Sequence, residues 1–243
     1  MMTESKSRRG YMPSDQKEFV QQISTLRKAA KDVRYLLEEG YPMKNATTFV
    51  GNHYLLSERQ RLALARSLTT EGQAEKRRAK ELQRSDLTGR TVSIDGFNTI
   101  ISLEIAFSGS TLLCCMDGTV RDLAGLRGNY RIIDKTTLAI RAIRNELAAA
   151  RVSGAVVYLD APVSNSGRLK EKIAEEFEGS GIDLDIQVVC DVDRILMASS
   201  CVVTSDAVIL DACESWYNLT VVAIEREIGS YPFVRVLGER EML

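Results

Sequence analysis

The sequence has few of the residues that hold soft metals or build disulfides. It contains one histidine, His53, which excludes a multi-histidine metal site and most histidine-dependent mechanisms, apart from one that uses His53 itself. The five cysteines form no C-x-x-C pair, and their odd number argues against a complete disulfide framework. This pattern favours a reducing, cytoplasmic compartment. Any bound metal is expected to be held by carboxylates, which suit Mg²⁺, Mn²⁺ or Ca²⁺.

Long apolar runs are absent as well. No stretch reaches the roughly 18 apolar residues of a membrane-spanning helix, and the polar residues 1–10 lack the apolar core of a signal peptide. We therefore expect no membrane partner. The composition, 44% hydrophobic and 27% charged, is ordinary for a globular protein.

The net charge of −1 conceals a division of charge along the chain. Residues 1–90 contain 18 Lys or Arg and 11 Asp or Glu, whereas residues 91–243 contain 14 and 22. A basic part followed by an acidic part indicates two units with different tasks. We place the boundary near Gly89, which predicts a basic helical domain over residues 1–88 and an α/β domain over residues 89–243.

Helical patterns fill the basic part. Residues 1–13 resemble a frayed arm, and apolar residues at spacings of three and four then predict a long helix over residues 15–40. A short helix is expected over residues 43–52. An S-x-x-Q capping box opens another over residues 57–67, and residues 71–85 form a charged, helix-forming segment.

Basic side chains are frequent on the later helices of this part. Two short helices joined by a turn could dock on nucleic acid in the manner of a helix-turn-helix unit. The alternative is a small helical bundle with a solvated basic face, and the sequence does not choose between them. The candidates for binding nucleic acid are Arg59, Arg61, Arg66, Lys76, Arg77, Arg78 and Lys80.

Strand-like runs alternate with helical patterns in the second part, which predicts a largely parallel sheet flanked by helices. The expected strands are residues 91–95, 155–159, 186–189, 201–205 and 219–224, with a further edge strand at 234–237. Asp117-Gly118 between two short apolar runs predicts a hairpin. The expected fold class is therefore α/β, preceded by a small all-α domain.

Aspartates follow the expected strands at their carboxyl ends, where ligands bind in open α/β sheets. They are Asp95, Asp160, Asp191, Asp193, Asp206 and Asp211. Two unit charges about 4 Å apart cost roughly 4 kcal/mol at an effective dielectric of about 20. A converging cluster therefore needs a divalent cation, raised pKa values or wider spacing. A cation held by carboxylates would support hydrolysis of a phosphodiester.

A loop rich in small residues follows Asp160 and enters the next expected helix. Free backbone N–H groups and the helix dipole favour phosphate at such a place, and Arg168 would add a charge-assisted contact. The alternative is an ordinary strand-to-helix loop capped by Ser166. The phosphate-binding candidates are Asn98, Ser164, Asn165, Ser166, Gly167 and Arg168.

Two short motifs resemble those of NYN-type members of the PIN-like nuclease superfamily. Residues 95–98, Asp-Gly-Phe-Asn, resemble the D-G-[YF]-N opening of these proteins, and residues 203–211 resemble their later strand-T/S-x-D segment. Asp191 or Asp193 is similar to the acidic residue that precedes this segment. The whole chain also resembles an uncharacterised, mainly archaeal family in which a helical domain precedes a PIN-like domain, and the loop of residues 160–167 is associated with that family.

This resemblance implies a PIN-like parallel sheet, a Mg²⁺- or Mn²⁺-dependent site like that of a ribonuclease, and often a homodimer. Carried over residue by residue, it makes Asp95 and Asp206 metal ligands, with Asp211 and one of Asp191 or Asp193 completing the shell. The chain departs from the superfamily pattern in its Asp-Gly hairpin and its small-residue loop. The candidates for one further acidic position are Glu104, Asp122 and Asp134.

The leading hypothesis is a metal-dependent nuclease acting on RNA or DNA, with RNA favoured over DNA and with the basic helices contacting phosphates. Its catalytic candidates are Asp95, Asp160, Asp206 and Asp211, and its metal-binding candidates are Asp95, Asp191, Asp193, Asp206 and Asp211. Two alternatives stay open. One is a non-catalytic RNA-binding or scaffold protein on the same fold. The other is an enzyme acting on a nucleotide or another phosphorylated small molecule held at residues 164–168.

Overall fold

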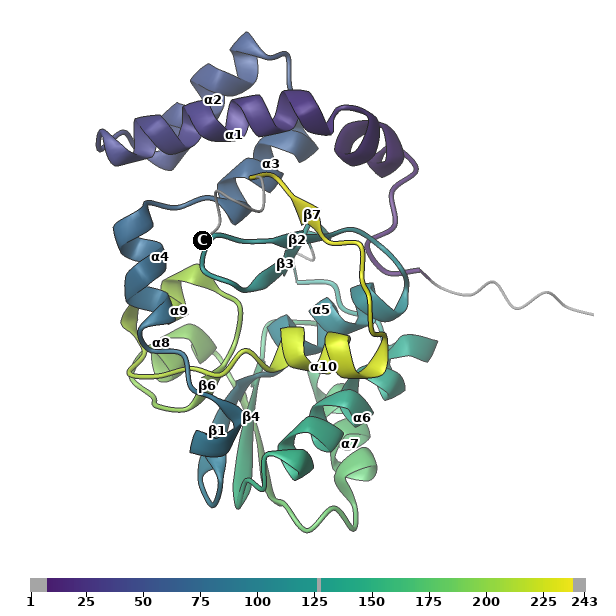
Figure 1. The fold of residues 1–243 in the computed structure, drawn as a ribbon. Coiled ribbons are helices and arrows are strands. Elements are labelled where there is room, and N and C mark those ends of the chain that lie inside the picture. Colours follow the sequence, from purple (N-terminus) through teal and green to yellow (C-terminus); the bar gives the residue numbers. More distant parts are fainter. Residues whose placement is uncertain (1–7, 126–127, 238–243) are drawn as a thin grey trace, which may run out of the picture.

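The structure, a computed structural model, describes residues 8–125 and 128–237. Figure 1 shows helices at one end, a small sheet in the middle, and a parallel sheet with its own helices at the other end. This is the fold class that the sequence predicts, α/β with a parallel sheet behind an all-helical region.

The parallel sheet has the strand order β5-β4-β1-β6. Its strands are β1 (Thr91–Asp95), β4 (Gly154–Asp160), β5 (Asp183–Val189) and β6 (Val202–Val203). Val157 and Leu159 of β4 pack in the main core, whereas Tyr158 packs on the opposite face against a cluster around Trp216. Both faces of the sheet are therefore covered, as parallel strands require.

Helices cover the two faces (Figure 1). The main core contains residues of α5 (Gly96–Phe107), α6 (Asp134–Ala149), α7 (Ser166–Phe177) and α10 (Leu219–Glu227). The opposite face is packed by α8 (Val192–Met197) and α9 (Ala207–Ala212), which enclose the fully buried Trp216. Within the described ranges, no helix is both long and apolar enough to cross a membrane.

The predicted strand over residues 219–224 is wrong, because this segment begins α10. Consecutive β-branched residues such as Val221 and Val222 are typical of strands. The buried residues of the helix are nevertheless Leu219, Thr220, Ala223 and Ile224. Their spacing is helical, so packing of that face against the core overrides the β-propensity.

The strand order reverses beside β1. The chain runs from β1 to β4 to β5 in one direction and then returns to add β6 on the other side of β1. The helix that follows β1 lies on one face of the sheet and the helix that follows β6 lies on the other. Such a switch point leaves a crevice at the carboxyl ends of the strands, where open α/β sheets bind ligands.

The second sheet has the order β3-β2-β7. β2 (Leu112–Cys114) and β3 (Val120–Asp122) form the hairpin that Asp117-Gly118 predicts, and Gly118 adopts a positive φ of 85° in its turn. β7 (Val234–Arg235) pairs with β2 in parallel. The prediction of an edge strand in this part of the chain is confirmed.

The helical region contains a π-helical turn (Gln16–Gln21), α1 (Ile23–Glu38), α2 (Met43–His53), α3 (Glu58–Ser67) and α4 (Glu71–Arg78). The predicted capping box is present, since the Ser57 hydroxyl accepts from the Gln60 N–H and the Gln60 side chain accepts from the Ser57 N–H. Two predicted helices differ in extent. The first is interrupted at Gln22, and the last stops at Arg78.

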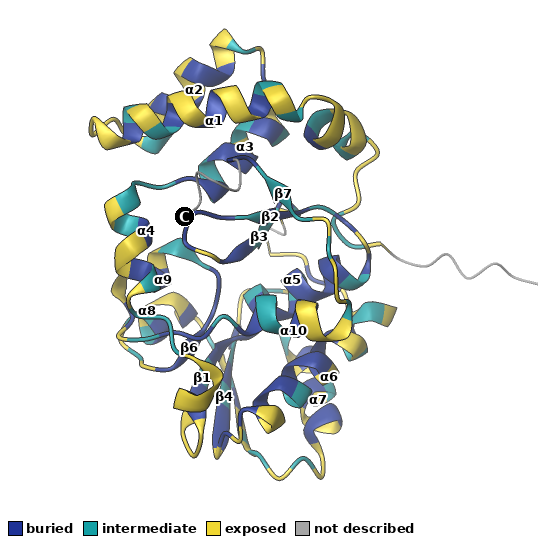
Figure 2. Ribbon diagram, viewed as in Figure 1, coloured by how far each residue is buried: buried dark blue, intermediate teal, exposed yellow. Residues whose placement is uncertain are grey.

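The second sheet closes the core of the helical region. Leu26 of α1 and Leu64 of α3 belong to one buried cluster with Leu113 of β2 and with Val236. Figure 2 shows buried residues on the inner sides of these helices and exposed residues on their outer sides. The helices therefore share their core with residues beyond the predicted boundary at residue 88.

A short arm before the helices is bound to the α/β part. Arg8 donates to the carbonyl oxygen of Ser108 at the end of α5, and the Arg9 N–H donates to the Ser108 hydroxyl. The Arg9 side chain is only 8% exposed and reaches inward to Glu104. The expectation of a frayed arm is wrong for Arg8 and Arg9, and residues 1–7 lie outside the described residues.

Candidate active site

Asp95 ends β1 at the switch point and caps the helix that follows. Its Oδ1 accepts from the Asn98 N–H at 3.2 Å, and its Oδ2 accepts from the Thr204 hydroxyl at 2.9 Å. Gly96 lets α5 begin this close to the sheet, because a Cβ there would lie 2.6 Å from the Leu159 side chain and 2.8 Å from a backbone carbonyl oxygen. Asp95 is consequently buried, with 7% of its surface exposed.

The segment after β6 interlocks with the start of α5. Asp206 caps α9, its Oδ1 accepting from two backbone N–H groups. The Thr204 hydroxyl accepts from the Asp206 N–H while donating to Asp95. The Asn98 amide oxygen accepts from both the N–H and the hydroxyl of Ser205, at 2.8 and 2.9 Å. The two sequence motifs thus form one hydrogen-bonded unit across the switch point.

The electrostatic environment of Asp95 disfavours its charge. Burial is the largest cause that raises its pKa, which reaches about 7. The hydrogen bonds from Thr204 and Asn98 act in the opposite direction, and the negative charges of Asp160 and Asp206 add to the rise. A carboxyl group with such a pKa at a switch point is a candidate functional group.

Neighbouring strand ends extend this acidic edge. Burial, and then the charge of Asp193, raises the pKa of Asp160 at the end of β4. Burial, and then the charges of Asp206 and Asp191, raises the pKa of Asp193 beyond β5. The predicted carboxylates therefore interact along the edge. They are nevertheless spread out, and in the described parts of the chain no three His, Cys, Asp or Glu side chains are grouped so that they could hold a metal ion.

Replacing Asp95 with asparagine is expected to stabilise the fold at alkaline pH in the absence of divalent cations. The folded-state pKa of Asp95, about 7, lies above its unfolded value of about 3.9. The stability that the protonated carboxyl contributes is therefore complete below pH 4 and is lost as the pH rises through 7. We expect Asp95→Asn to exceed the wild type by on the order of 1–3 kcal/mol at pH 8, and not at pH 4. Urea unfolding at both pH values measures this.

The control for that comparison is Asp183→Asn, which changes an exposed carboxylate at the opposite, amino end of β5. It should leave the pH dependence as in the wild type. An Asp95→Asn variant whose difference from the wild type is the same at both pH values would contradict the raised pKa.

A cavity of about 490 Å³ lies between this edge and the helical region. From the helical region its wall includes Arg66 and Thr69, and from the sheet edge it includes Asn98, Ser205 and Asp206. A volume of roughly 300–1,000 Å³ is usual for sites that bind small molecules. The cavity therefore has room for a ligand beside Asp206, the carboxylate of the acidic edge that lines it.

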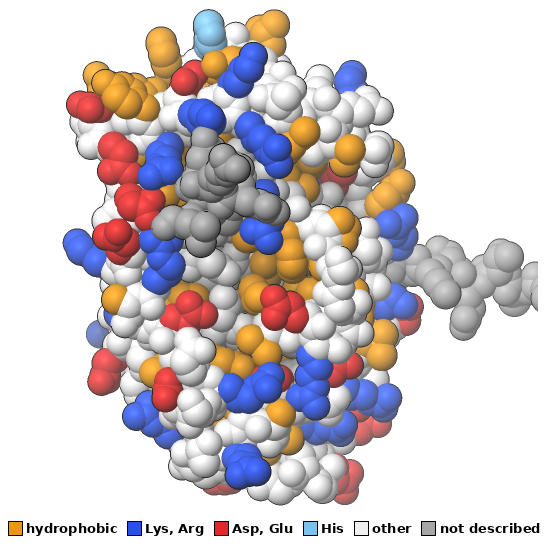
Figure 3. Space-filling model, in the orientation of Figure 1, with side chains coloured by type: hydrophobic (Ala, Val, Ile, Leu, Met, Phe, Trp, Pro, Cys, Tyr) orange, Lys and Arg blue, Asp and Glu red, His pale blue; other side chains and the backbone are white. Residues whose placement is uncertain are grey.

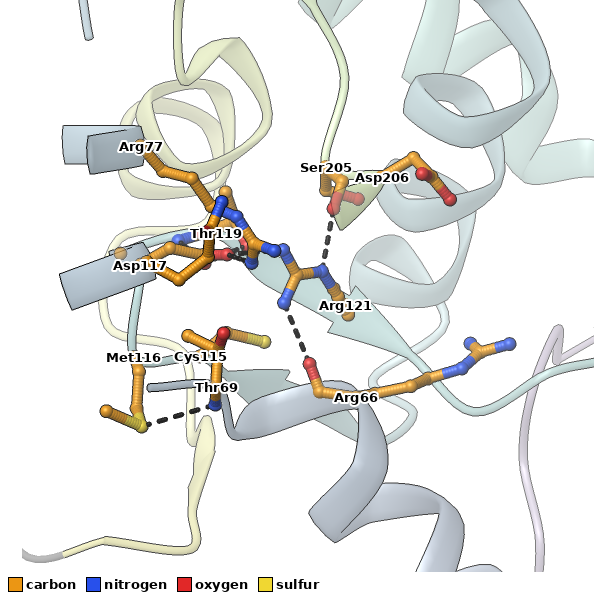
Figure 4. A network of polar contacts seen from close by, with 12 residues as sticks. Arg66, Thr69, Arg77, Cys115, Met116, Asp117, Thr119, Arg121, Ser205 and Asp206 are labelled. Atoms are coloured by element: carbon orange, nitrogen blue, oxygen red, sulfur yellow. Dashed lines mark hydrogen bonds and ion pairs between the residues drawn. The ribbon is translucent and has the colours of Figure 1, made fainter. Parts of the chain in front are cut away.

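A buried network holds the two walls of the cavity together (Figure 4). Asp117 has no exposed side-chain surface and forms ion pairs with Arg77 at 2.7 Å and with Arg121 at 2.5 Å. Arg121 also donates to the carbonyl oxygens of Ser205 and Arg66, at 2.7 and 2.8 Å. One side chain of the hairpin thus ties the end of α3 to the loop that carries Asp206.

Arg121 is a site residue that the sequence does not reveal. Its partners Arg66 and Ser205 lie 55 and 84 residues away along the chain, so no local spacing marks it. Thr204 lies inside the T-S-D motif, but its hydrogen bond to Asp95 spans 109 residues and is visible only in the folded chain.

Asp211 is engaged elsewhere. Its carboxylate accepts from Arg77 Nε and Nη2, at 2.5 and 3.0 Å, and from the Gln73 amide at 2.5 Å. It thereby joins α4 to α9. Asp191 and Asp193 are exposed at the start of α8. The charges of Asp160 and Asp206 act on Asp95, and the charge of Asp193 acts on Asp160. Catalytic and metal-binding roles for all six aspartates stay predictions.

Two residues of the predicted phosphate-binding loop form hydrogen bonds with Tyr130 of the same chain. The Ser164 hydroxyl and the Asn165 amide both donate to the Tyr130 carbonyl oxygen. Asn165, in a left-handed conformation with φ of 63°, is the N-terminal cap position of α7 and forms no side-chain cap, and Ser166 is the first helical residue. Ser166 is therefore not the cap that the alternative interpretation expects. Phosphate binding by the remaining backbone and by Arg168, which is exposed, stays a prediction.

Most of the predicted nucleic-acid-binding residues form contacts within the chain. Arg59 pairs with Asp15, Arg61 with Asn52, Arg66 with Asp122, Arg77 with Asp117 and Asp211, and Arg78 with Glu71, while Lys80 donates to the Asp211 and Cys213 carbonyl oxygens. Lys76 is exposed. On the face shown in Figure 3, basic and acidic side chains are interspersed. Nucleic-acid binding by these residues stays a prediction.

Two protein families match the chain. Residues 84–222 match the family described as "Domain of unknown function (DUF5616)", and residues 25–80 match the one described as "Protein of unknown function (DUF434)". The "Uncharacterized protein MJ0935" of Methanocaldococcus jannaschii is 35% identical over 201 residues, which are 82% of this chain and 95% of that protein. No solved structure matches the chain.

Proposed function

The chain belongs to the DUF5616 family, and for this member we propose metal-dependent hydrolysis of phosphodiesters in RNA at the carboxyl edge of β1 and β6. One observation carries the proposal. Asp95 is a buried carboxyl group with a pKa of about 7, placed at the switch point near Asp206, which lines a cavity of about 490 Å³. The similarity of two short motifs to NYN-type PIN-like nucleases supports the same reading.

The residues fit a weakly held divalent ion rather than a closed metal cage. Mg²⁺ is usually bound by one or two carboxylates, with water and substrate phosphates filling the remaining positions. Asp95 and Asp206 would hold it, since both carboxylates lie at the switch point and the charge of Asp206 raises the pKa of Asp95. When bound, such an ion polarises a phosphoryl oxygen and lowers the pKa of a coordinated water.

Other residues of the chain would position Asp95, accept a proton and contact the phosphate. The Thr204 hydroxyl and the Asn98 N–H hold the two oxygens of Asp95 in place. Asp160 is half-buried at the end of the neighbouring strand and has a raised pKa, so it is suited to accept a proton from an attacking water. Arg66, on the opposite wall of the cavity, is suited to contact a phosphate oxygen.

The test is cleavage of an RNA panel with Mg²⁺ or Mn²⁺. We expect Asp95→Asn and Asp206→Asn each to lower turnover by at least about 100-fold, because each removes a charge at the proposed ion site. Asp183→Asn, at the far end of the sheet, should cleave as the wild type does. Thermal unfolding confirms that the variants are folded. Undiminished cleavage by folded Asp206→Asn would sink the proposal.

A second candidate function is favoured by the size of the cavity, which lies within the usual range for small-molecule sites. In that case the substrate is a nucleotide or another phosphorylated small molecule rather than a polymer. Release of phosphate from mononucleotides, with RNA left intact, would distinguish it. A non-catalytic RNA binder would instead show RNA binding that weakens steeply with salt and no turnover with either ion.

We also propose a cytoplasmic location, because all five cysteines are free thiols, as is usual in a reducing compartment. The homodimer implied by the family resemblance is tested by light scattering of the purified protein. A mass of 27.0 kDa would show a monomer.

A further inference from the structure

We propose that the cavity between the helical region and the sheet edge binds one nucleoside monophosphate unit, with its phosphate at Arg66 and its base against an apolar wall. The choice of a nucleotide rests on the proposed function, whereas the cavity and its chemistry do not. The inference assigns the helical region a part in binding the substrate, through residues of α2 and α3 and of the segment after α3.

Arg66 is the arginine of the cavity that retains free donors. Arg77 uses three guanidinium nitrogens on Asp211 and Asp117, and Arg121 uses three on Ser205, Arg66 and Asp117. Arg66 uses only Nη1, toward Asp122. Among the described residues its Nε and Nη2 have no partner, and a third of its side chain is exposed. A planar pair of N–H donors of this kind matches the oxygens of a phosphate.

Two further polar residues line the same cavity. The Asn98 amide oxygen is fully used by Ser205, which leaves the amide N–H₂ without a partner in the part of the chain that the structure describes. The backbone of Thr69 is engaged with Met116, and its hydroxyl likewise has no partner within those residues. These groups offer a few fixed hydrogen bonds, which is how small-molecule sites orient a ligand.

Besides its charged residues, which include Asp122 and Asp206, the cavity wall has an apolar part. It includes Met43 and Leu68 from the helical region and Ile101 from α5. Contact with apolar side chains does not stabilise a free phosphate, whereas burial against them stabilises a nucleotide base. The flexible thioether of methionine also adapts to a flat aromatic ring. A ligand with an anionic end and a flat apolar end, beside the proposed site of phosphodiester hydrolysis, describes a nucleotide.

Calorimetric titration tests the inference directly. Wild-type protein without divalent cations, so that no turnover occurs, is titrated with each of the four ribonucleoside 5′-monophosphates, with inorganic phosphate and with a nucleoside. We expect at least one monophosphate to bind at least about 10-fold more tightly than either inorganic phosphate or the nucleoside, because only the monophosphate uses both walls. Absence of monophosphate binding up to millimolar concentration would overturn the inference.

Two variants and a charge-matched control locate the contacts. Arg66→Gln should weaken monophosphate binding at least about 10-fold, and Arg66→Lys should weaken it less because the charge remains without the planar fork. Lys170→Gln removes the same charge from an exposed site on α7 and should bind as the wild type does. Equal losses in Arg66→Gln and Lys170→Gln would reduce the effect to general electrostatics and overturn the assignment.

Nucleotide binding by the cavity and RNA cleavage can succeed or fail independently of each other. Monophosphate binding that depends on Arg66, without RNA cleavage, would uphold the cavity as a nucleotide site and reject the nuclease. RNA cleavage without any monophosphate binding would uphold the nuclease and reject the cavity as its nucleotide site. Thermal unfolding of each variant, compared with the wild type, shows that changes in affinity are not changes in folding.

Discussion

Replacing Arg9 with methionine is expected to lower the free energy of unfolding by about 3–5 kcal/mol at pH 8. The Arg9 Nε lies 2.5 Å from Glu104 Oε2, and the Glu104 side chain has no exposed surface. The contact is an ion pair without hydrogen-bond geometry. Methionine replaces Arg9 with an unbranched apolar side chain. The substitution leaves the buried carboxylate of Glu104 without its counter-charge, and an unpaired buried charge strongly lowers stability.

The loss should depend on pH with a definite sign. Burial already raises the pKa of Glu104, while Arg9 and hydrogen bonds from Thr136 and Tyr130 act to lower it. Without Arg9 the folded-state pKa rises further above its unfolded value of about 4.3. The variant therefore loses stability as the pH rises from about 4.3, and its deficit should be smaller at pH 5 than at pH 8.

Urea unfolding of a double-mutant cycle provides the measurement. Glu104→Gln removes the buried charge, so Arg9→Met combined with Glu104→Gln should recover most of the stability that Arg9→Met alone loses. Arg131→Met, an exposed arginine in the segment between Tyr130 and α6, is the control and should change little. If the double variant is no more stable than Arg9→Met, the loss does not come from the unpaired carboxylate.

The Asp117→Asn variant should lose a similar amount, about 3–5 kcal/mol at pH 7. Asparagine can still accept from Thr119, as Asp117 Oδ1 does at 2.7 Å. The substitution nevertheless removes the negative charge of the fully buried Asp117, which pairs with both Arg77 and Arg121. Two guanidinium groups are then left close together with less compensation, although Arg77 keeps its pair with Asp211.

The pH profile identifies the origin of this loss. Burial acts to raise the pKa of Asp117, but the charge of Arg121 and hydrogen bonds from Thr119, Arg121 and Arg77 lower it to about 2. The unfolded value is about 3.9. The stabilisation is therefore present above pH 4 and is lost as the pH falls through 2. The variant should lack this part of the acid sensitivity of the wild type.

Urea titrations at pH 2.5, 4 and 7 check the prediction. The control is Asp134→Asn, whose exposed carboxylate pairs with Lys135 at the start of α6; exposed pairs contribute little, so it should stay close to the wild type. An Asp117→Asn variant as stable as the wild type at pH 7 would show that the network is not a determinant of the fold.

Features fixed by neighbouring residues could be predicted from the sequence. The strand that ends at Asp95, the Asp117-Gly118 hairpin and the capping box at Ser57 each depend on a few consecutive side chains. The strand ends, and hence the acidic edge, follow from the same patterns. The prediction of a strand over residues 219–224 is wrong, because β-branched side chains occur in strands and also in helices whose packing favours them.

Features that depend on distant partners could not be predicted. Asp211 lies within α9, after Asp206 in the same motif, and its carboxylate meets Arg77, which is 134 residues away. The cavity likewise needs α2, α3 and the segment after α3 to lie over α5 and the end of β6. No local pattern states how a helical region is placed over a sheet, so the sequence predicts Arg66 as a residue that binds nucleic acid but does not place it in this cavity.

The helical region shares its apolar core with residues of the second sheet and with Val236, so the two parts of the chain depend on each other for folding. The segment matched by one family, residues 25–80, supplies α1 to α4, but its apolar interior is completed by Leu113 and Val236, which lie outside that segment. A gene that encoded either segment alone would yield a product with an uncovered apolar surface, prone to aggregate. The two segments are thus expected to pass between genomes as a pair, and a split gene would survive only where both products are made together.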